Sequence, residues 1–342
     1  MNLALAPMDW ITDAAFRIVT KQIFDKHNQN NKLRLITEFM NVSWYLRNPE
    51  WVYKHLLHSG IEENLTAQIY WGSQEELIKT SINLDQNYDF RGIELNIGCP
   101  SPKVIACWWG VGMLYNKKET LETIKKISKN INRHFSIKTR IWLNQYDIQE
   151  QKYFLQEASK YCNIISIHWR TYKQSHWWEV DRDFVYDIKN TAHSDCSVFG
   201  NWWITSYPDA LDKINNLDWI MIWQAAVWNP WIFVNKSPSL EELKKTIIYH
   251  LDLMCALEII FNKCIWKKYL PTIGSEEINH TISNLENKYS SYLKAPIEFR
   301  KHLFSYLKWI HWSKEFKQKV SRIKDYKDLK QNIFQFFKKA ED

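Results

Sequence analysis

Eight short apolar segments, each followed by a segment with helical character, fill about the first 235 residues, and this repeat constrains the fold more than any other feature. Strands that alternate with helices build parallel sheets, so eight units in this length predict an α/β protein with a closed (β/α)8 TIM barrel. The predicted strands are Leu3–Met8, Leu33–Phe39, Leu65–Tyr70, Ile93–Ile97, Phe135–Ile141, Ile164–His168, Ser197–Asn201 and Trp219–Ile222. A doubly wound open sheet is disfavoured because Pro7-Met8-Asp9 replaces its glycine-rich first turn.

Helical patterns separate these strands. Thr12 is the expected N-cap of the first helix, and Asn229-Pro230 begins the last helix of the barrel with a cap residue and a proline. The helices predicted between them are Pro49–Leu57, Gln74–Leu84, Lys118–Ile131, Ile148–Tyr161, Asp183–Lys189 and Pro208–Ile214.

The composition changes after residue 235, which divides the chain into a predicted barrel domain, 1–235, and a smaller all-helical domain, 236–342. Ser239 and Glu242 have capping-box spacing, a polar insertion covers about 262–293, and helical periodicity returns at Pro296. Residues 300–339 hold 12 lysines and arginines against 3 acidic residues. This excess indicates either a solvated helix face or a surface that binds nucleic-acid phosphates.

The overall composition, 45% hydrophobic and 24% charged, is ordinary for a soluble globular protein. No apolar run approaches the ~18 residues of a membrane span, and no signal segment opens the chain, so we expect a cytoplasmic protein without membrane contact. The six cysteines form no Cys-x-x-Cys pair and have no histidine at ligand spacing, so we expect neither a zinc site nor a disulfide framework.

Cys99 stands where the fourth predicted strand ends, in the turn Gly98-Cys99-Pro100. Glycine gives this turn backbone freedom, and proline prevents the strand from continuing. A buried, inert thiol is the ordinary alternative for a lone cysteine. Catalytic residues of a barrel lie at the carboxyl ends of its strands, which makes Cys99 a candidate catalytic group.

Other polar residues end the remaining strands and should converge on the same face. A flavin mononucleotide suits them, because Lys138 could stabilise negative charge on the reduced ring and Gln68 could hydrogen-bond its amide edge. A salt bridge in the barrel mouth is the alternative for Lys138, and a core position is the alternative for His168. The set is Pro7, Met8, Gln68, Asn96, Cys99, Lys138, His168, Arg170, Asn201, Trp223 and Gln224.

Together these motifs resemble the bacterial tRNA-dihydrouridine synthases over nearly the whole chain. The matching segments are Leu5-Ala6-Pro7-Met8, Thr12-Asp13 with Phe16-Arg17, Asn96-Ile97-Gly98-Cys99-Pro100, Lys138-Thr139-Arg140, Ile167-His168 with Arg170-Thr171, Asn229-Pro230-Trp231-Ile232-Phe233, and Arg300-Lys301-His302 with Tyr306-Leu307.

The resemblance implies an FMN-dependent reductase that uses NADPH and converts particular tRNA uridines to 5,6-dihydrouridine, with hydride passing to C6 and Cys99 donating the proton to C5. It implies a monomer that binds tRNA through the C-terminal helices and holds no metal. The cofactor residues that it implies are Pro7, Met8, Asp9, Gln68, Lys138, His168 and Asn201, with Trp202, Trp203, Trp223 and Gln224 at the phosphate loops. Asn96, Arg170, Arg300 and Lys301 are expected to face the tRNA.

The tryptophans depart from the family pattern. The chain has 19 tryptophans and 8 glycines, whereas average usage of about 7% predicts roughly 24 glycines. We hypothesise that UGA codons meaning glycine were read here as tryptophan. Family glycines match Trp202, Trp203, Trp223, Trp10, Trp108, Trp109, Trp142, Trp169, Trp219 and Trp228, and we add Trp44, Trp177, Trp178, Trp266, Trp309 and Trp312. Trp231 matches a family tryptophan, Trp51 and Trp71 have no assignment, and Gln224 stands at a family arginine.

Two other functions stay open at this level. A flavin barrel that acts on a small molecule, such as a dihydroorotate dehydrogenase-like or ene-reductase-like enzyme, would lack a use for the basic helices. A non-catalytic RNA-binding scaffold follows if indoles really occupy the phosphate loops, since they would keep backbone amides away from a phosphate.

Overall fold

The computed structural model describes the whole chain except residues 28–29, 142–146, 172–180, 228, 289–292, 309 and 342, and the side chains at 202, 288, 311, 340 and 341. Two compact units emerge. The first, here called the barrel unit, contains Met1–Trp10, Gln29–Leu56 and Glu63–Gln224. The second, here called the helical unit, contains Ile11–Asn28, Leu57–Glu62 and Ala225–Asp342.

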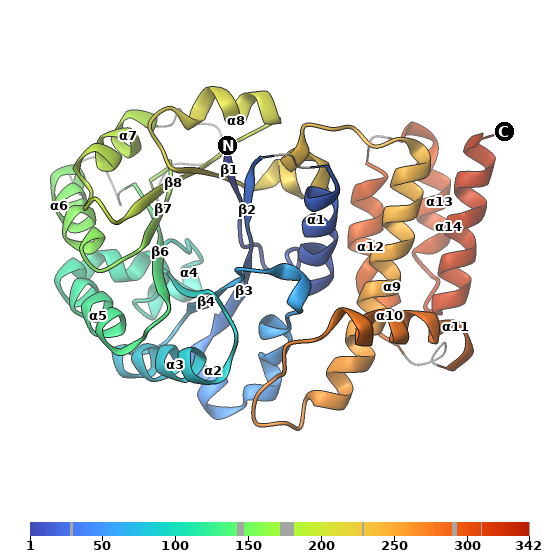
Figure 1. Ribbon diagram of the computed structural model, residues 1–342, viewed down its shortest axis with the longest axis horizontal. Coiled ribbons are helices and arrows are strands. Elements are labelled where there is room, and N and C mark those ends of the chain that lie inside the picture. Colours follow the sequence, from blue (N-terminus) through green and yellow to red (C-terminus); the bar gives the residue numbers. More distant parts are fainter. Residues whose placement is uncertain are drawn as a thin grey trace. The chain divides into compact units, whose positions relative to one another are not determined.

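A single parallel sheet forms the centre of the barrel unit, with strand order β2-β1-β9-β8-β7-β6-β5-β4-β3 (Figure 1). Only Leu35 separates β2 from β3, yet β2 pairs with β1 and β3 pairs with β4. One interrupted strand therefore closes the ring, and the predicted eight-position TIM barrel is confirmed. The strands are β1 Asn2–Leu5, β2 Lys32–Arg34, β3 Ile36–Asn41, β4 Thr66–Tyr70, β5 Gly92–Asn96, β6 His134–Arg140, β7 Ile164–His168, β8 Ser197–Trp202 and β9 Trp219–Ile222.

Helices surround these strands (Figure 1). A capping box starts α3: Ser73 accepts from the Glu76 amide, and the Glu76 carboxylate accepts from the Ser73 amide. The predicted cap at Ser239 is confirmed, since its side chain accepts from the Glu242 amide. In the first helix, Asp13 rather than the predicted Thr12 caps the start, because its side chain accepts from the Phe16 amide. The helices of the barrel unit are α2 Val42–Arg47, α3 Gln74–Asn87, α4 Pro102–Ala106, α5 Lys117–Asn130, α6 Ile148–Ser159, α7 Arg182–Thr191 and α8 Tyr207–Ile214.

Two helix predictions need correction. The segment 49–57 is not one α-helix but two 3-10 turns, η1 Pro49–Trp51 and η2 Tyr53–Leu56, because Val52 N–H donates to the Pro49 carbonyl and His55 N–H to the Val52 carbonyl, three residues back. The segment after Asn229 is likewise a 3-10 helix, η7 Pro230–Val234, which ends at Asn235 in the left-handed conformation.

The helical unit confirms the predicted helical C-terminal region and also contains the first helix of the chain. Its longest helix, α9, packs against α1, α10, α12 and α14. The insertion at 262–293, where the sequence shows no strong period, contains two short helices, α10 and α11. The helices are α1 Ala14–His27, η3 Gly60–Glu62, α9 Leu240–Cys264, α10 Ser275–Ser283, α11 Leu285–Lys288, α12 Ala295–Tyr306, η8 His311–Ser313, α13 Lys314–Val320 and α14 Tyr326–Glu341.

A buried arginine ties three short segments of the helical unit together. The Arg17 Nε lies 2.6 Å from a Glu62 carboxylate oxygen, and its other nitrogens donate to the Thr12 and Leu57 carbonyls at 2.7 Å. Every acceptor is internal, so removing the guanidinium would leave a buried carboxylate uncompensated. Within the described residues, no helix is long and apolar enough to cross a bilayer.

The close approach of β5 and β6 gives a test of the barrel. A Cβ at Gly92 would lie 2.6 Å from the His134 carbonyl oxygen, which belongs to the backbone and cannot rotate away. We expect Gly92→Ala to lower the free energy of unfolding by about 1–3 kcal/mol in chemical denaturation. Gly60→Ala, where a Cβ meets nothing within 4 Å, is the control, and equal effects of the two changes would contradict this account of the packing.

Candidate functional site

The turn that carries Cys99 is held from both sides. Asn96, the last residue of β5, accepts the Gly98 amide at 3.0 Å through its side chain. Ile97 donates to the Lys138 carbonyl at 2.9 Å, and the Cys99 carbonyl accepts from the Val111 amide at 3.1 Å. The thiol is partly exposed. The fold thus fixes a reachable sulfur at the mouth of the barrel.

The environment of Cys99 keeps its thiol protonated. Burial raises its pKa above the ordinary value, and the negative charge of Asp9 acts in the same direction. A hydrogen bond from the Ser101 backbone and the cations Arg140 and Lys138 oppose this rise without cancelling it. A thiol in this state is suited to giving up a proton during a reaction rather than to acting as a standing thiolate nucleophile.

Arg140 is a site residue that the strand-end analysis missed. Its Nε donates to the Gly98 carbonyl at 2.9 Å, and its Nη1 donates to the Thr171 carbonyl at 3.3 Å. The side chain therefore links the cysteine turn to the loop after β7. Burial lowers the pKa of Arg140 to about 10, so it stays charged at neutral pH. The only signal in the sequence was its presence in Lys138-Thr139-Arg140, at the end of a predicted strand.

A chain of buried polar side chains runs below the cysteine turn. Asn96 donates to the Gln68 amide oxygen at 3.1 Å, and Gln68 donates to the Glu94 carboxylate at 2.6 Å. Burial raises the pKa of Glu94, although Gln68 and Lys138 oppose the rise. Glu94 was not predicted as a site residue, although a lone carboxylate inside an apolar strand was a signal.

Lys138 lies in β6 opposite Asn96 in the neighbouring strand. Burial lowers its pKa to about 8, and the attraction of Glu94 limits the fall. Its ammonium group is therefore still mostly protonated at neutral pH but close to its titration point. A buried cation of this kind is suited to stabilising negative charge on a bound group.

His168, Asn201 and Trp223 lie near one another at the ends of β7, β8 and β9. Asn201 donates to the Met221 carbonyl at 3.1 Å, and the Trp223 indole meets the His168 ring edge-on at 5.9 Å between centroids. Arg170 is buried in the loop after β7. The structure thus brings these four predicted residues to one face of the barrel.

The remaining predicted residues fall into three groups. Pro7, Met8 and Asp9 follow β1 after Ala6, and Met8 is buried. Trp203, which follows β8, is 45% exposed, and Gln224 is exposed at the start of the 3-10 helix η6 Gln224–Ala226. Six further tryptophans have side chains outside the described part of the chain: Trp142, Trp177, Trp178, Trp202, Trp228 and Trp309. Arg300 and Lys301 lie on α12, where Arg300 donates to the Ile323 carbonyl and the Lys301 ammonium is 3.9 Å from Asp13.

These residues fit one end of a flavin better than the other. The Lys138 ammonium offers the positive charge that the polar edge of the ring requires, whereas the Gln68 amide already donates to Glu94 and the Asn96 amide to Gln68. The phosphate end needs exposed backbone amides or cations. Instead the chain places the Trp203 and Trp223 indoles beside the loops after β8 and β9, and this part does not fit.

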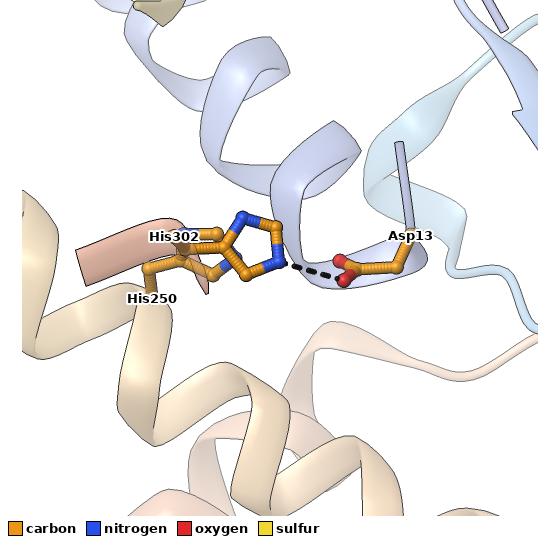
Figure 2. Close-up of side chains that lie close together, drawn as sticks. All are labelled: Asp13, His250 and His302. Atoms are coloured by element: carbon orange, nitrogen blue, oxygen red, sulfur yellow. Dashed lines mark hydrogen bonds and ion pairs between the residues drawn. The ribbon is translucent and has the colours of Figure 1, made fainter. Parts of the chain in front are cut away.

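Two groups of three side chains bring potential metal ligands within 4.8 Å of one another among the described residues: Asp9, Glu38 and His55, and Asp13, His250 and His302. Glu38 already accepts the Trp10 amide at 2.6 Å. Figure 2 shows His302 pointing its Nε2 at Asp13, 3.1 Å away, with His250 beside it. His250 contacts the Tyr306 hydroxyl at 3.1 Å through Nδ1. In the second group, these contacts already join Asp13, which directly precedes α1, to α9 and α12.

Burial governs the protonation of both histidines. It lowers the pKa of His302, although Asp13 opposes the fall, and it lowers the pKa of His250 well below the ordinary value. A neutral His302 that carries its proton on Nε2 fits the hydrogen bond to Asp13. Burial would raise the pKa of Asp13, but the contact with His302 holds that pKa well below its usual range. At neutral pH the cluster therefore joins an Asp13 carboxylate to two neutral histidines inside the helical unit.

Comparison with known proteins gives a family match over almost the entire length. The family model "Dihydrouridine synthase (Dus)" matches residues 4–341. A "Probable tRNA-dihydrouridine synthase" of Helicobacter pylori is 25% identical over 348 residues, which cover 98% of this chain and 92% of the relative. A protein of the same name from Staphylococcus epidermidis is 28% identical over 304 residues, covering 83% and 89%. Among solved structures, a mandelate oxidase aligns with a TM-score of 0.44 and 10% identity over 68% of this chain and 65% of its own.

The contacts of Arg140 predict its effect on the thiol. Because the guanidinium lowers the pKa of Cys99, we expect Arg140→Gln to raise that pKa, so the pH at which iodoacetamide alkylates Cys99 half-maximally moves upward. Arg140→Lys should restore part of the shift. Alkylation of the exposed Cys107 in the same samples is the reference. An unchanged midpoint for Cys99 in Arg140→Gln would show that the guanidinium does not act on the thiol.

The two buried histidines predict a pH dependence of stability. They stay neutral in the folded chain but bind protons in the unfolded chain below pH 6.5, their ordinary pKa, so the free energy of unfolding should fall as the pH drops from 7 to 5. A tenfold difference in proton affinity between the folded and unfolded chains changes the free energy of unfolding by about 1.4 kcal/mol.

Replacing His250 tests this pH dependence. We expect His250→Asn to flatten the fall in stability measured by chemical denaturation at several pH values, because asparagine does not titrate there. His193→Asn, at a histidine that is 48% exposed, should keep the wild-type slope. If His250→Asn also keeps the wild-type slope of stability against pH, the buried neutral histidines do not cause the fall in stability.

Proposed function

The chain belongs to the dihydrouridine synthase family, and from this membership we propose that it reduces specific uridines of tRNA to 5,6-dihydrouridine. The single observation that carries the proposal is a family match from residue 4 to residue 341, which includes both the barrel and the basic C-terminal helices. A flavin barrel acting on a small molecule would not account for the match over those helices. The relatives named above carry the same activity in their names.

The reaction adds two electrons and two protons across the C5–C6 double bond of uracil. The resemblance implies FMN as the cofactor and NADPH as the reductant, and the buried Lys138 would hold the polar edge of a bound flavin. Bound FMN would supply the hydride for C6. Residues of this chain would supply the proton for C5 and would position the uracil.

Cys99 is assigned the proton that C5 receives. Charge develops on the uracil ring as C6 is reduced, and a general acid within hydrogen-bond reach neutralises it as it forms. The thiol Sγ holds a proton at neutral pH because burial raises the pKa of Cys99. Its carbonyl and its neighbours Gly98 and Ile97 are all hydrogen-bonded, which supports a fixed direction for the transfer.

Lys138, Asn96 and Gln68 are assigned to positioning. Lys138 would hold the anionic edge of the reduced ring, and Glu94 would keep the lysine protonated by raising its pKa. Asn96 has two tasks in this scheme, since it holds Gln68 through its amide nitrogen and the cysteine turn through its amide oxygen. The rest of the barrel mouth around the reacting base would be lined by His168, Arg170 and Asn201.

The basic helices are assigned to the tRNA. Residues 300–339, with 12 basic and 3 acidic side chains, span most of α12 to α14 and supply charge for backbone phosphates. The target uridine has to leave its stack to enter the barrel, at a cost of a few kcal/mol that backbone contacts offset. A tRNA substrate also supports action in the cytoplasm.

The assigned role of Cys99 is directly testable. We expect Cys99→Ala to keep the flavin and its visible absorbance but to lower the rate of dihydrouridine formation by about 10²–10⁴-fold, because the uracil then lacks its proton donor. Dihydrouridine is mapped in tRNA from cells that lack the gene and carry either wild type or the variant. Cys107→Ala, at an exposed cysteine, is the matched control. Unchanged tRNA modification with Cys99→Ala would remove this residue from the mechanism.

A further inference from the structure

Three tryptophans occupy backbone conformations that a residue with a Cβ rarely adopts. The φ angles are 64° at Trp10, 62° at Trp71 and 62° at Trp108, all in the left-handed region. Every other described residue with positive φ is an asparagine or a glycine: Asn64, Asn215, Asn235 and Gly110. Asparagine and glycine are the residues that tolerate this region, whereas for a bulky aromatic residue it is a steric outlier.

The three positions share a place in the fold. Trp10 follows β1, Trp71 directly follows β4, and Trp108 lies between α4 and η4 (Gly110–Asn116) in the connection after β5. All three belong to loops at the carboxyl ends of barrel strands, the face that carries Cys99. Sharp turns in such connections favour a residue without a Cβ, because it adopts positive φ without steric cost.

The backbone atoms of all three residues make hydrogen bonds, while the Trp71 ring contacts Trp109 and the Trp108 ring contacts Tyr115. The Trp10 amide donates to Glu38, the Trp71 carbonyl accepts from the Ser43 amide at 3.3 Å, and the Trp108 amide donates to the Ile105 carbonyl at 2.8 Å. Two of the indoles are largely in solvent, with Trp10 64% and Trp108 67% exposed. A residue without a side chain would keep every one of these hydrogen bonds and lose the steric conflict.

We propose that residues 10, 71 and 108 are glycine in the protein made by its own cells, encoded by UGA codons that this sequence renders as tryptophan. The composition supports the same codon reading, since 19 tryptophans accompany only 8 glycines. The positive φ of Trp71 adds this residue to the group, although its sequence context alone gave it no assignment. With glycine at these positions, the mouth of the barrel has three flexible turn residues in place of three indoles.

If Trp203 and Trp223 are also glycine, the indoles that do not fit the phosphate end of the flavin site are absent. This extension rests on the proposed function. Trp203 and Trp223 flank the loops after β8 and β9, and the Trp223 ring stands against His168. With glycine at both positions, the backbone amides of these loops become accessible to an anionic group.

Peptide mass spectrometry of the protein isolated from the source cells decides the identity of the three residues. Glycine in the peptides that contain positions 10, 71 and 108, together with TGA in the gene at those codons, supports the proposal. Tryptophan in those peptides, or TGG codons, overturns it. This measurement does not depend on activity, so glycine in a protein that fails to modify tRNA would reject the proposed function alone.

A matched pair of variants tests the backbone argument in the chain as written. Trp10 and Trp51 are both 64% exposed, but only Trp10 has a left-handed backbone; Trp51 ends the 3-10 helix η1. We expect Trp10→Gly to raise Tm by a few degrees and Trp51→Gly to leave it unchanged or lower it. A Tm that falls with Trp10→Gly, or that rises equally with Trp51→Gly, contradicts the steric argument.

Discussion

Parallel pairing of all neighbouring strands is the constraint on which the site depends. Because each strand runs in the same direction, Asn96, Lys138, His168 and Asn201 reach the same edge of the sheet although they are far apart in the chain. The interruption at Leu35 lets one strand pair with both β1 and β4, so the edge becomes a closed mouth. The chemistry of the protein is therefore a consequence of strand direction and ring closure.

Much of this could be predicted from the sequence because it follows from local periodicity. Apolar runs of strand length and amphipathic segments located the barrel strands, and the Gly98-Cys99-Pro100 turn located the thiol. The 3-10 turns at 49–56 were missed because single-residue propensities do not distinguish hydrogen bonds that reach back three residues from those that reach back four. The grouping of α1 with the C-terminal helices rests on contacts such as Asp13 with His302, which are 289 residues apart.

Arg140 and Glu94 show why the site itself was only partly predictable. Each acts through a partner on a neighbouring element: Arg140 through the Gly98 carbonyl, and Glu94 through Gln68 and Lys138. Strand register decides such pairings, and a shift by one residue would turn either side chain to the opposite face. The composition reveals an excess of tryptophan over glycine, but only the backbone angles distinguish Trp10, Trp71 and Trp108, whose φ is positive, from the other described tryptophans.

The protonated state of Cys99 has a consequence for the life of the enzyme in an oxidising cell. Peroxides and disulfides attack thiolates far faster than thiols, so the burial that raises the pKa of Cys99 also slows its conversion to sulfenic acid. Cys107, eight residues further along the same connection, is exposed to solvent and so is more accessible to oxidants. Oxidation should therefore modify Cys107 before Cys99.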